Sequence, residues 1–119
     1  MSFDWREYLE LAKCLRKKSS SYSEEAALRS GVSRAYYAAF VYCRNYARDC
    51  ETFSPGYHGG DHKDIRDYFT DSGRASLAQD LEDLHKWRKK CDYCDGVLNL
   101  NDLYGAAISS ARVVIRSLK

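Results

Sequence analysis

The sequence predicts an all-α fold, an antiparallel up-and-down bundle of four long helices plus one short helix. Two observations favour this fold. Apolar residues recur at helical spacing in five segments, and no segment shows a convincing period-two alternation. The expected helices span residues 3–18, 24–50, 61–70, 74–93 and 101 to the C-terminus.

The first two expected helices differ in composition. Residues 3–18 end in the basic run RKK, where the helix dipole favours cations. Residues 24–50 are rich in alanine and contain a glycine, so neighbouring helices can approach this segment closely. We therefore expect it to be the central helix of the bundle. Ser23 is its expected N-cap because Glu24 and Glu25 follow in the first turn.

Turn signals separate the remaining helices. The stretch TFSPGYHGGD ends the second helix, and DSG precedes the fourth. Asp61 is the expected cap of the short third helix. Its buried side is expected to hold Ile65, Tyr68 and Phe69.

Length and composition indicate one domain that spans residues 1–119. The chain is 45% apolar and 30% charged, too apolar for disorder and too broken by charge for a membrane span. Acidic residues in MSFDWREYLE argue against a signal peptide, and an odd number of cysteines argues against a disulfide framework. We therefore expect a cytoplasmic protein. Its net charge of +2 is too small to indicate nucleic-acid binding by itself.

Arg88 interrupts the apolar stripe of the fourth expected helix. Leucines recur upstream at the spacing of one helix face, and the next two steps fall on Arg88 and Cys91. A guanidinium in such a position requires partners or a water-filled cleft. Asp92, one turn onward, offers a structural ion pair, whereas the neighbouring Tyr93 keeps the region polar and favours a cleft. Both interpretations stay open.

Arg34 repeats this anomaly on the second helix, among small residues. Two such arginines can jointly hold an anion such as phosphate, because each offers a fork of donors. Equally, each can anchor a buried carboxylate such as Asp80 or Asp83. Tyr37 belongs to a tyrosine cluster on the same helix, which is typical of a core with a polar rim or of a base-stacking platform.

Histidines and cysteines give weaker signals. His58 and His62, followed by Arg66, form a histidine patch, but spacing places no third ligand, so we expect no metal. Cys91 and Cys94 have the CxxC spacing without a second pair, so two reduced thiols are expected. The sequence has no Gly-rich phosphate loop, no nucleophile elbow and no HExxH motif, and we expect no cofactor.

Three motifs together resemble the HEPN domain superfamily, especially its small single-domain prokaryotic branch. They are SRAYYAAF on the second helix, GGDHKDI at the third and LHKWRKKCDYCDG at the end of the fourth. The resemblance extends from about Glu24 to Lys119. It includes an Arg-x-x-x-Asp-Tyr signature, formed here by Arg88, Asp92 and Tyr93.

The resemblance implies a homodimer whose fourth helices face each other across a shared cleft. Many members of the superfamily are metal-independent ribonucleases, often toxins encoded beside a minimal nucleotidyltransferase antitoxin, and others bind nucleotides or RNA without catalysis. The ribonuclease signature is an arginine followed, after four to six residues, by a histidine. Arg88 matches the arginine, but Tyr93, Cys94 and Asp95 occupy the candidate histidine positions. An ordinary tyrosine is a poor base at neutral pH.

The leading hypothesis is a homodimer with an anion- or RNA-binding cleft and a nucleotidyltransferase-like partner. Arg88, Asp92 and Tyr93 are the candidate catalytic residues, with Arg88 binding the phosphate. The candidate ligand-binding residues are Arg34, Tyr37, His62 and Arg88.

The alternative is a non-catalytic nucleotide-binding or protein-interaction module, in which Tyr93 accepts a nucleotidyl group. In a third possibility the chain is a structural dimer, and Arg88 and Asp92 simply satisfy each other.

Overall fold

The computed structural model describes residues 3–17 and 23–118, and within these ranges the chain forms five helices and no strand. The all-α prediction is therefore confirmed. No helix in the described ranges is both long and apolar enough to cross a bilayer. The helices are α1 Glu7–Lys17, α2 Glu24–Cys50, α3 Asp61–Asp71, α4 Ala75–Tyr93 and α5 Leu100–Ser117.

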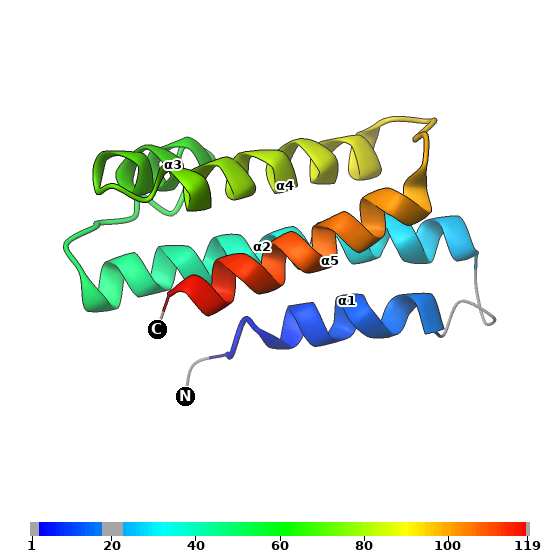
Figure 1. Cartoon of the computed structure of the whole chain (residues 1–119), viewed down its shortest axis with the longest axis horizontal. Helices are drawn as coiled ribbons and strands as arrows, with labels where there is room; N and C mark the ends of the chain where they lie inside the picture. Colours follow the sequence, from blue (N-terminus) through cyan, green and yellow to red (C-terminus); the bar gives the residue numbers. More distant parts are fainter. Residues whose placement is uncertain (1–2, 18–22, 119) are drawn as a thin grey trace.

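The α2 helix is the central element, as its small residues predict. It contacts α1, α3, α4 and α5. In Figure 1, α3 and α4 lie on one side of α2 and α5, and α1 lies on the other. Chain colours show that α1 and α4 run in one direction and α2 and α5 in the other (Figure 1).

Gly31 shows why α2 is rich in small residues. A Cβ atom built on Gly31 would lie 2.5 Å from Cε1 of Tyr104, far inside van der Waals contact. The absence of that atom lets the Tyr104 hydroxyl pass α2 and donate a hydrogen bond to the carbonyl of Ala12, at 2.5 Å. One glycine thus permits a link between α5 and α1 across the central helix.

The helix lengths differ from the expectation of four long helices and one short helix. The first helix begins at Glu7 rather than at residue 3, so the described part of α1 has 11 residues, as many as the short helix α3. The other helices, α2, α4 and α5, have 27, 19 and 18 residues. The Asp4 carboxylate accepts the backbone N–H of Arg6 at 3.0 Å. Such a local side-chain contact competes with helical hydrogen bonding and delays the start of the helix. Residue 18, the predicted end of this helix, lies outside the described residues.

Of the two predicted caps, one is confirmed and one is wrong. Ser23 Oγ accepts the backbone N–H of Ala26 at 3.3 Å, as an N-cap does. The N-cap of α3 is instead Gly60. The Asp61 carboxylate points back toward the preceding loop, where it accepts the N–H groups of Gly56 and Tyr57 at 2.8 and 2.7 Å. Asp61 therefore fixes the loop rather than the helix.

Candidate functional site

Arg88 lies on α4 with only 16% of its side chain exposed, so the guanidinium is largely withdrawn from water. Its Nε lies 2.8 Å from Oδ2 of Asp92, one turn onward, and forms an ion pair with it. The hydroxyl of Ser33 on α2 donates to the same Asp92 oxygen at 3.3 Å. The ion pair expected from the sequence is present, and Ser33 holds its acidic partner in place.

The ion pair engages Nε of Arg88 and leaves the two Nη groups of the guanidinium unused. The buried Nε has no hydrogen-bond partner among the described residues, because its N–H does not point at the nearby carboxylate oxygen. No other donor of this guanidinium forms a hydrogen bond within the same residues. The Cζ atom instead lies over two aromatic rings, 5.1 Å from the centroid of Tyr37 and 5.5 Å from that of Tyr93. Arg88 is therefore held by charge and by ring faces, and its two Nη groups stay available.

The second arginine predicted from the sequence joins this cluster. Arg34 places its Cζ 5.4 Å from the centroid of Tyr37 and 4.9 Å from that of Tyr8. The Tyr37 ring thus contacts two guanidinium groups, from α2 and from α4. In the described part of the chain neither arginine pairs with Asp80 or Asp83, so the alternative of anchored carboxylates at those positions is wrong.

Arg29 on α2 fixes the end of α4 from which the candidate residues project. Its guanidinium donates to the carbonyls of Cys91, Cys94 and Asp95, at 3.1, 2.5 and 2.7 Å. A cation at this position satisfies carbonyl groups that have no partner inside the helix. Arg29 therefore holds the last turn of α4, which carries Asp92 and Tyr93, against α2.

A pair of stacked histidines lies within electrostatic reach of Arg88. His62, at the start of α3, and His85, on α4, stack with ring centroids 4.8 Å apart and planes 6° from parallel. Phe40 stacks on His62 at 4.4 Å, and Tyr36 stacks on His85 at 5.2 Å. The positive charge of Arg88 acts on both imidazoles. Aromatic packing thus holds both rings in fixed planes.

Hydrogen bonds assign different roles to the two rings. Nη1 of Arg66 lies 3.3 Å from Nδ1 of His85. A guanidinium can only donate, so this Nδ1 accepts, and the proton of neutral His85 sits on Nε2. Nδ1 of His62 forms a short hydrogen bond with the hydroxyl of Tyr36. In the tautomer in which Nδ1 donates to that hydroxyl, Nε2 of His62 is unprotonated and can accept a proton from a ligand.

Both imidazoles are neutral at pH 7. Burial, followed by the neighbouring His62 ring and the cations Lys89, Arg66 and Arg88, lowers the pKa of His85 to about 4. Burial and the charges of Arg88 and Arg66 also lower the pKa of His62 below its usual value. Burial raises the pKa of Tyr36, so its hydroxyl keeps its proton. The cluster therefore combines fixed positive charge with unprotonated imidazoles.

These groups can act on a phosphodiester. An arginine with free donors can bind a phosphate, and a neutral imidazole can accept a proton from a hydroxyl. The second imidazole, with its proton on Nε2, can donate a hydrogen bond to an oxygen that gains negative charge.

The structure gathers every candidate residue predicted from the sequence. Arg34, Tyr37, Arg88, Asp92 and Tyr93 are linked by the ion pair and ring contacts described above. The sixth candidate, His62, has its ring 6.4 Å from that of Tyr37.

Sequence reasoning missed His85 and the positioning roles of Arg29 and Ser33. His85 precedes Arg88 by three residues, a spacing that places both side chains on one helix face. That spacing was the signal in the sequence that could have found it. Nothing in the sequence pairs Arg29 with carbonyls more than 60 residues away.

Metal and thiol chemistry find little support in the described residues. They contain no group of three or more His, Cys, Asp or Glu side chains arranged to hold a metal ion. Cys91 is buried and Cys94 exposed, and both are free thiols. Burial raises the pKa of Cys91 to about 11, so this thiol is not a nucleophile at neutral pH.

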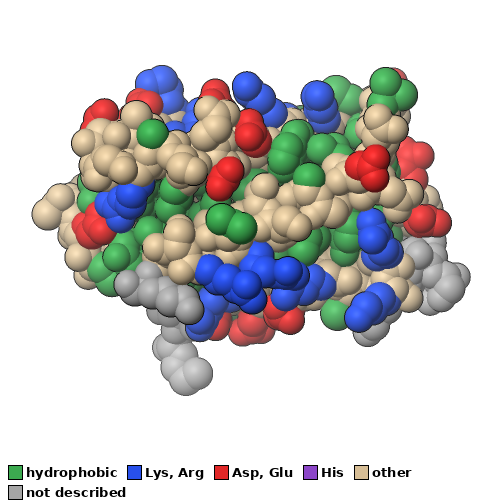
Figure 2. All heavy atoms as spheres, viewed as in Figure 1, with side chains coloured by type: hydrophobic (Ala, Val, Ile, Leu, Met, Phe, Trp, Pro, Cys, Tyr) green, Lys and Arg blue, Asp and Glu red, His purple; other side chains and the backbone are tan. Residues whose placement is uncertain are grey.

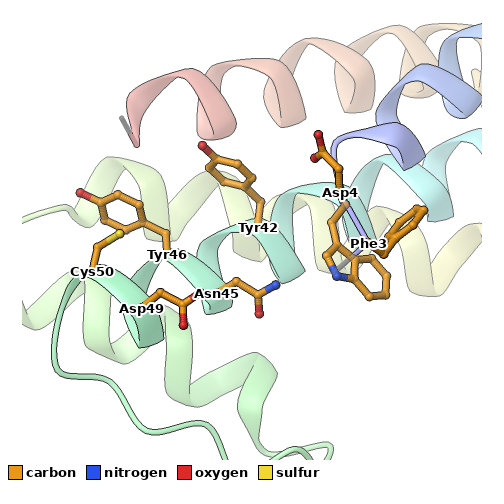
Figure 3. Close-up of a pocket in the computed structure, with 8 residues that line it drawn as sticks. Phe3, Asp4, Tyr42, Asn45, Tyr46, Asp49 and Cys50 are labelled. Atoms are coloured by element: carbon orange, nitrogen blue, oxygen red, sulfur yellow. The ribbon is translucent and has the colours of Figure 1, made fainter. Parts of the chain in front are cut away.

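Four other hollows on the surface of the described residues have no imidazole in their lining. Figure 3 shows a pocket of about 250 Å³ where aromatic side chains of α2 meet the segment that precedes α1, including Tyr42, Tyr46 and Phe3. A run of Lys and Arg side chains crosses the face drawn in Figure 2. Arg112 and Arg116 border a depression of about 200 Å³ between α1 and α5. The pocket beside Tyr42 is lined by aromatic rings together with Asp4 and Asp49, and the depression between α1 and α5 is lined by Glu10 as well as by cations.

No family model, no curated protein and no solved structure matches this chain. The resemblance to the HEPN superfamily therefore stays a prediction from the three sequence motifs.

The lowered histidine pKa values predict a loss of stability on mild acidification. A His85 pKa of about 4 in the folded chain, against about 6.5 when unfolded, means that the unfolded state binds more protons between these values. Stability should therefore fall as the pH falls through this window. Thermal unfolding followed by circular dichroism between pH 7 and 4.5 should show a falling Tm, and His85→Phe should reduce the slope.

Gly105→Ala is the matched control, because nothing lies within 4 Å of the added Cβ and alanine favours the helix. It should raise Tm at every pH and leave the slope unchanged. An unchanged slope in His85→Phe would contradict the burial of a neutral imidazole at this site.

Proposed function

We propose that this chain is a HEPN-type RNA-binding protein that cleaves RNA without a metal. In this proposal it forms a cytoplasmic homodimer, its helices form the up-and-down bundle of that superfamily, and a minimal nucleotidyltransferase is its partner. One observation supports the catalytic part above all. A mostly buried guanidinium, whose two Nη groups form no hydrogen bond within the described residues, lies within electrostatic reach of two imidazoles that stay neutral at pH 7.

Arg88 would bind the phosphate of the scissile linkage. Asp92 is a positioning residue in this scheme, since it pairs with Arg88 while Ser33 holds its carboxylate. A phosphate replaces water around Arg88 without breaking a hydrogen bond of the guanidinium within the described chain. The interaction strengthens as charge develops on the phosphate oxygens, which is the condition for catalysis.

His62 would transfer the proton. Its Nε2 takes the proton of the ribose 2′-hydroxyl, and the 2′-oxygen forms a bond to phosphorus as the bond to the 5′-oxygen breaks. The imidazolium then returns the proton to the departing 5′-oxygen, which gives a 2′,3′-cyclic phosphate and a 5′-hydroxyl. His85 donates from Nε2 to a phosphate oxygen and keeps its proton. This scheme moves the proton transfer from Tyr93, where the sequence motif suggested it, to a better base.

The first test is cleavage of a fluorescent single-stranded RNA by the purified protein. His62→Ala should lower the rate about 100- to 10,000-fold, the usual contribution of a general acid–base group. Arg88→Ala should lower it by a similar factor, and Arg88→Lys should recover part of the loss by restoring charge without the fork of donors. The rate should fall as the pH drops below the lowered pKa of His62, because the imidazole becomes protonated and can no longer accept a proton.

The control variant is Arg112→Ala, which removes an arginine on α5 outside the cluster. It should cleave at the wild-type rate, and a 2′-deoxy substrate should resist cleavage by every variant. Absence of cleavage by the wild-type protein, or equal cleavage by wild type and Arg88→Ala, would overturn the enzymatic proposal.

The exposure of Tyr93 favours a second candidate, a non-catalytic module modified by its partner. The Tyr93 side chain is 73% exposed at the end of α4, and its ring lies 5.5 Å from Cζ of Arg88. Attack of the tyrosine oxygen on the α-phosphate of a nucleoside triphosphate, with loss of its proton and of pyrophosphate, would place a phosphodiester beside the guanidinium. That charge would compete with RNA for Arg88.

Co-expression with a minimal nucleotidyltransferase encoded beside this chain tests the second candidate. Intact-mass spectrometry should show the mass of one or more nucleotidyl groups on the wild-type protein and none on Tyr93→Phe. An unmodified mass in the presence of a transferase active on another substrate would rule this role out.

A further inference from the structure

The loop of residues 51–60, between α2 and α3, presents an aromatic ring to solvent in a strained backbone conformation. Tyr57 has a φ of 57°, in the left-handed region that non-glycine residues rarely adopt. Its side chain is nevertheless 60% exposed, so burial of the ring does not compensate for the strain. A strained residue persists only where its surroundings fix it, and such residues cluster at binding sites.

Asp61 fixes this conformation. It is only 2% exposed, and its carboxylate accepts the N–H groups of Gly56 and Tyr57. Burial opposes its negative charge, but the two amide hydrogen bonds and the nearby positive charges, Arg44 among them, together outweigh burial and keep the pKa of Asp61 below its usual value. The loop therefore keeps Tyr57 in place at neutral pH.

Two arginines of α2 hold the Tyr57 ring. The Cζ atom of Arg44 lies 5.0 Å from the ring centroid, and Nη1 of Arg48 donates to the Tyr57 hydroxyl at 3.0 Å. An exposed ring with cations at its face and at its hydroxyl resembles the platforms on which nucleic-acid bases stack, where guanidinium groups contact both ring and phosphate.

The Tyr57 ring borders a depression that extends to the candidate catalytic histidine. The depression has a volume of about 350 Å³, at the lower end of the range for small-molecule sites. Phe40, Arg44, Tyr57, His58 and His62 contribute to its lining. The platform and the imidazole proposed to transfer the proton therefore share one continuous surface.

We propose that this depression is a base-binding subsite for single-stranded RNA, in which one unpaired base stacks on Tyr57 and Arg44 contacts the adjoining phosphate. The subsite rests on the proposed function, because its ligand is a nucleotide next to the linkage held by Arg88. A base in a duplex cannot lay its face on a protein ring, so the subsite selects unpaired RNA. Stacking tolerates all four bases, and the preference is for an exposed base rather than for one sequence.

Binding of an uncleavable ligand tests this subsite separately from catalysis. The probe is a fluorescein-labelled 2′-O-methyl hexanucleotide, which lacks the attacking hydroxyl, measured by fluorescence anisotropy. Tyr57→Ala should weaken binding about 5- to 100-fold, the range measured for loss of one stacked base. Tyr57→Phe is the matched control because it keeps the ring and loses only the hydroxyl, and it should bind within about threefold of wild type.

Hexanucleotides with a single abasic residue complete the test. One abasic position should weaken binding to the wild-type protein, and with that probe Tyr57→Ala should cause no further loss. Equal weakening by Tyr57→Phe and Tyr57→Ala would overturn stacking in favour of the hydroxyl. Because Tyr57 is exposed, its variants should unfold at the wild-type temperature, which circular dichroism checks.

The outcomes separate the subsite from the proposed function. Wild-type affinity in Tyr57→Ala together with weakened binding in Arg88→Ala would overturn the subsite and leave the function standing. A wild-type protein that neither binds the hexanucleotide nor cleaves RNA would overturn both.

Discussion

The site depends on how α4 and α2 hold one buried arginine. The ion pair with Asp92 fixes the position of Arg88, and the Tyr37 ring covers part of the guanidinium. These contacts engage Nε and the ring face, so the side chain is fixed while its two Nη groups stay free of hydrogen bonds within the described residues. A guanidinium whose donors were all used inside the fold would be a structural anchor of the kind that Arg29 provides.

The state of the histidines follows from the crowding of cations around them. Arg66 occupies the lone pair of His85 Nδ1, and the charges of Arg66 and Arg88 oppose protonation of both rings. The same positive field that would attract a phosphate therefore keeps a base available at neutral pH. When a phosphate binds, its negative charge offsets that field, which raises the proton affinity of the imidazoles at the moment when a proton must be accepted.

The sequence predicts the helices and the main candidate residues because both leave local patterns. Helical periodicity gives the five segments, and a cation on an apolar stripe marks Arg88. The predicted start of α1 is too early, since Asp4 binds both the backbone and the guanidinium of Arg6 and forms a turn before the helix. The prediction that Asp61 caps α3 is wrong for a related reason. In the sequence, an aspartate at the start of a helix looks like an N-cap whether its side chain faces the helix or the preceding loop.

The histidine pair shows the limit of sequence reasoning more clearly. His62 and His85 are 23 positions apart, and only the packing of α3 on α4 brings their rings together. A search along α4 for a histidine after Arg88 finds none, whereas the folded chain places one imidazole before Arg88 on the same helix and another across from it. The strained backbone of Tyr57 is likewise invisible in the sequence, since it follows from the buried position of Asp61.

The most direct measurement of the central claim is the ¹⁵N–¹H NMR spectrum of the arginine side chains during titration with an uncleavable RNA dinucleotide. The Arg88 resonance, assigned by its absence in Arg88→Lys, should shift in proportion to the dinucleotide bound, while that of Arg29 should stay fixed. An Arg88 resonance that does not move at saturating dinucleotide would show that the guanidinium binds no phosphate and would contradict the account.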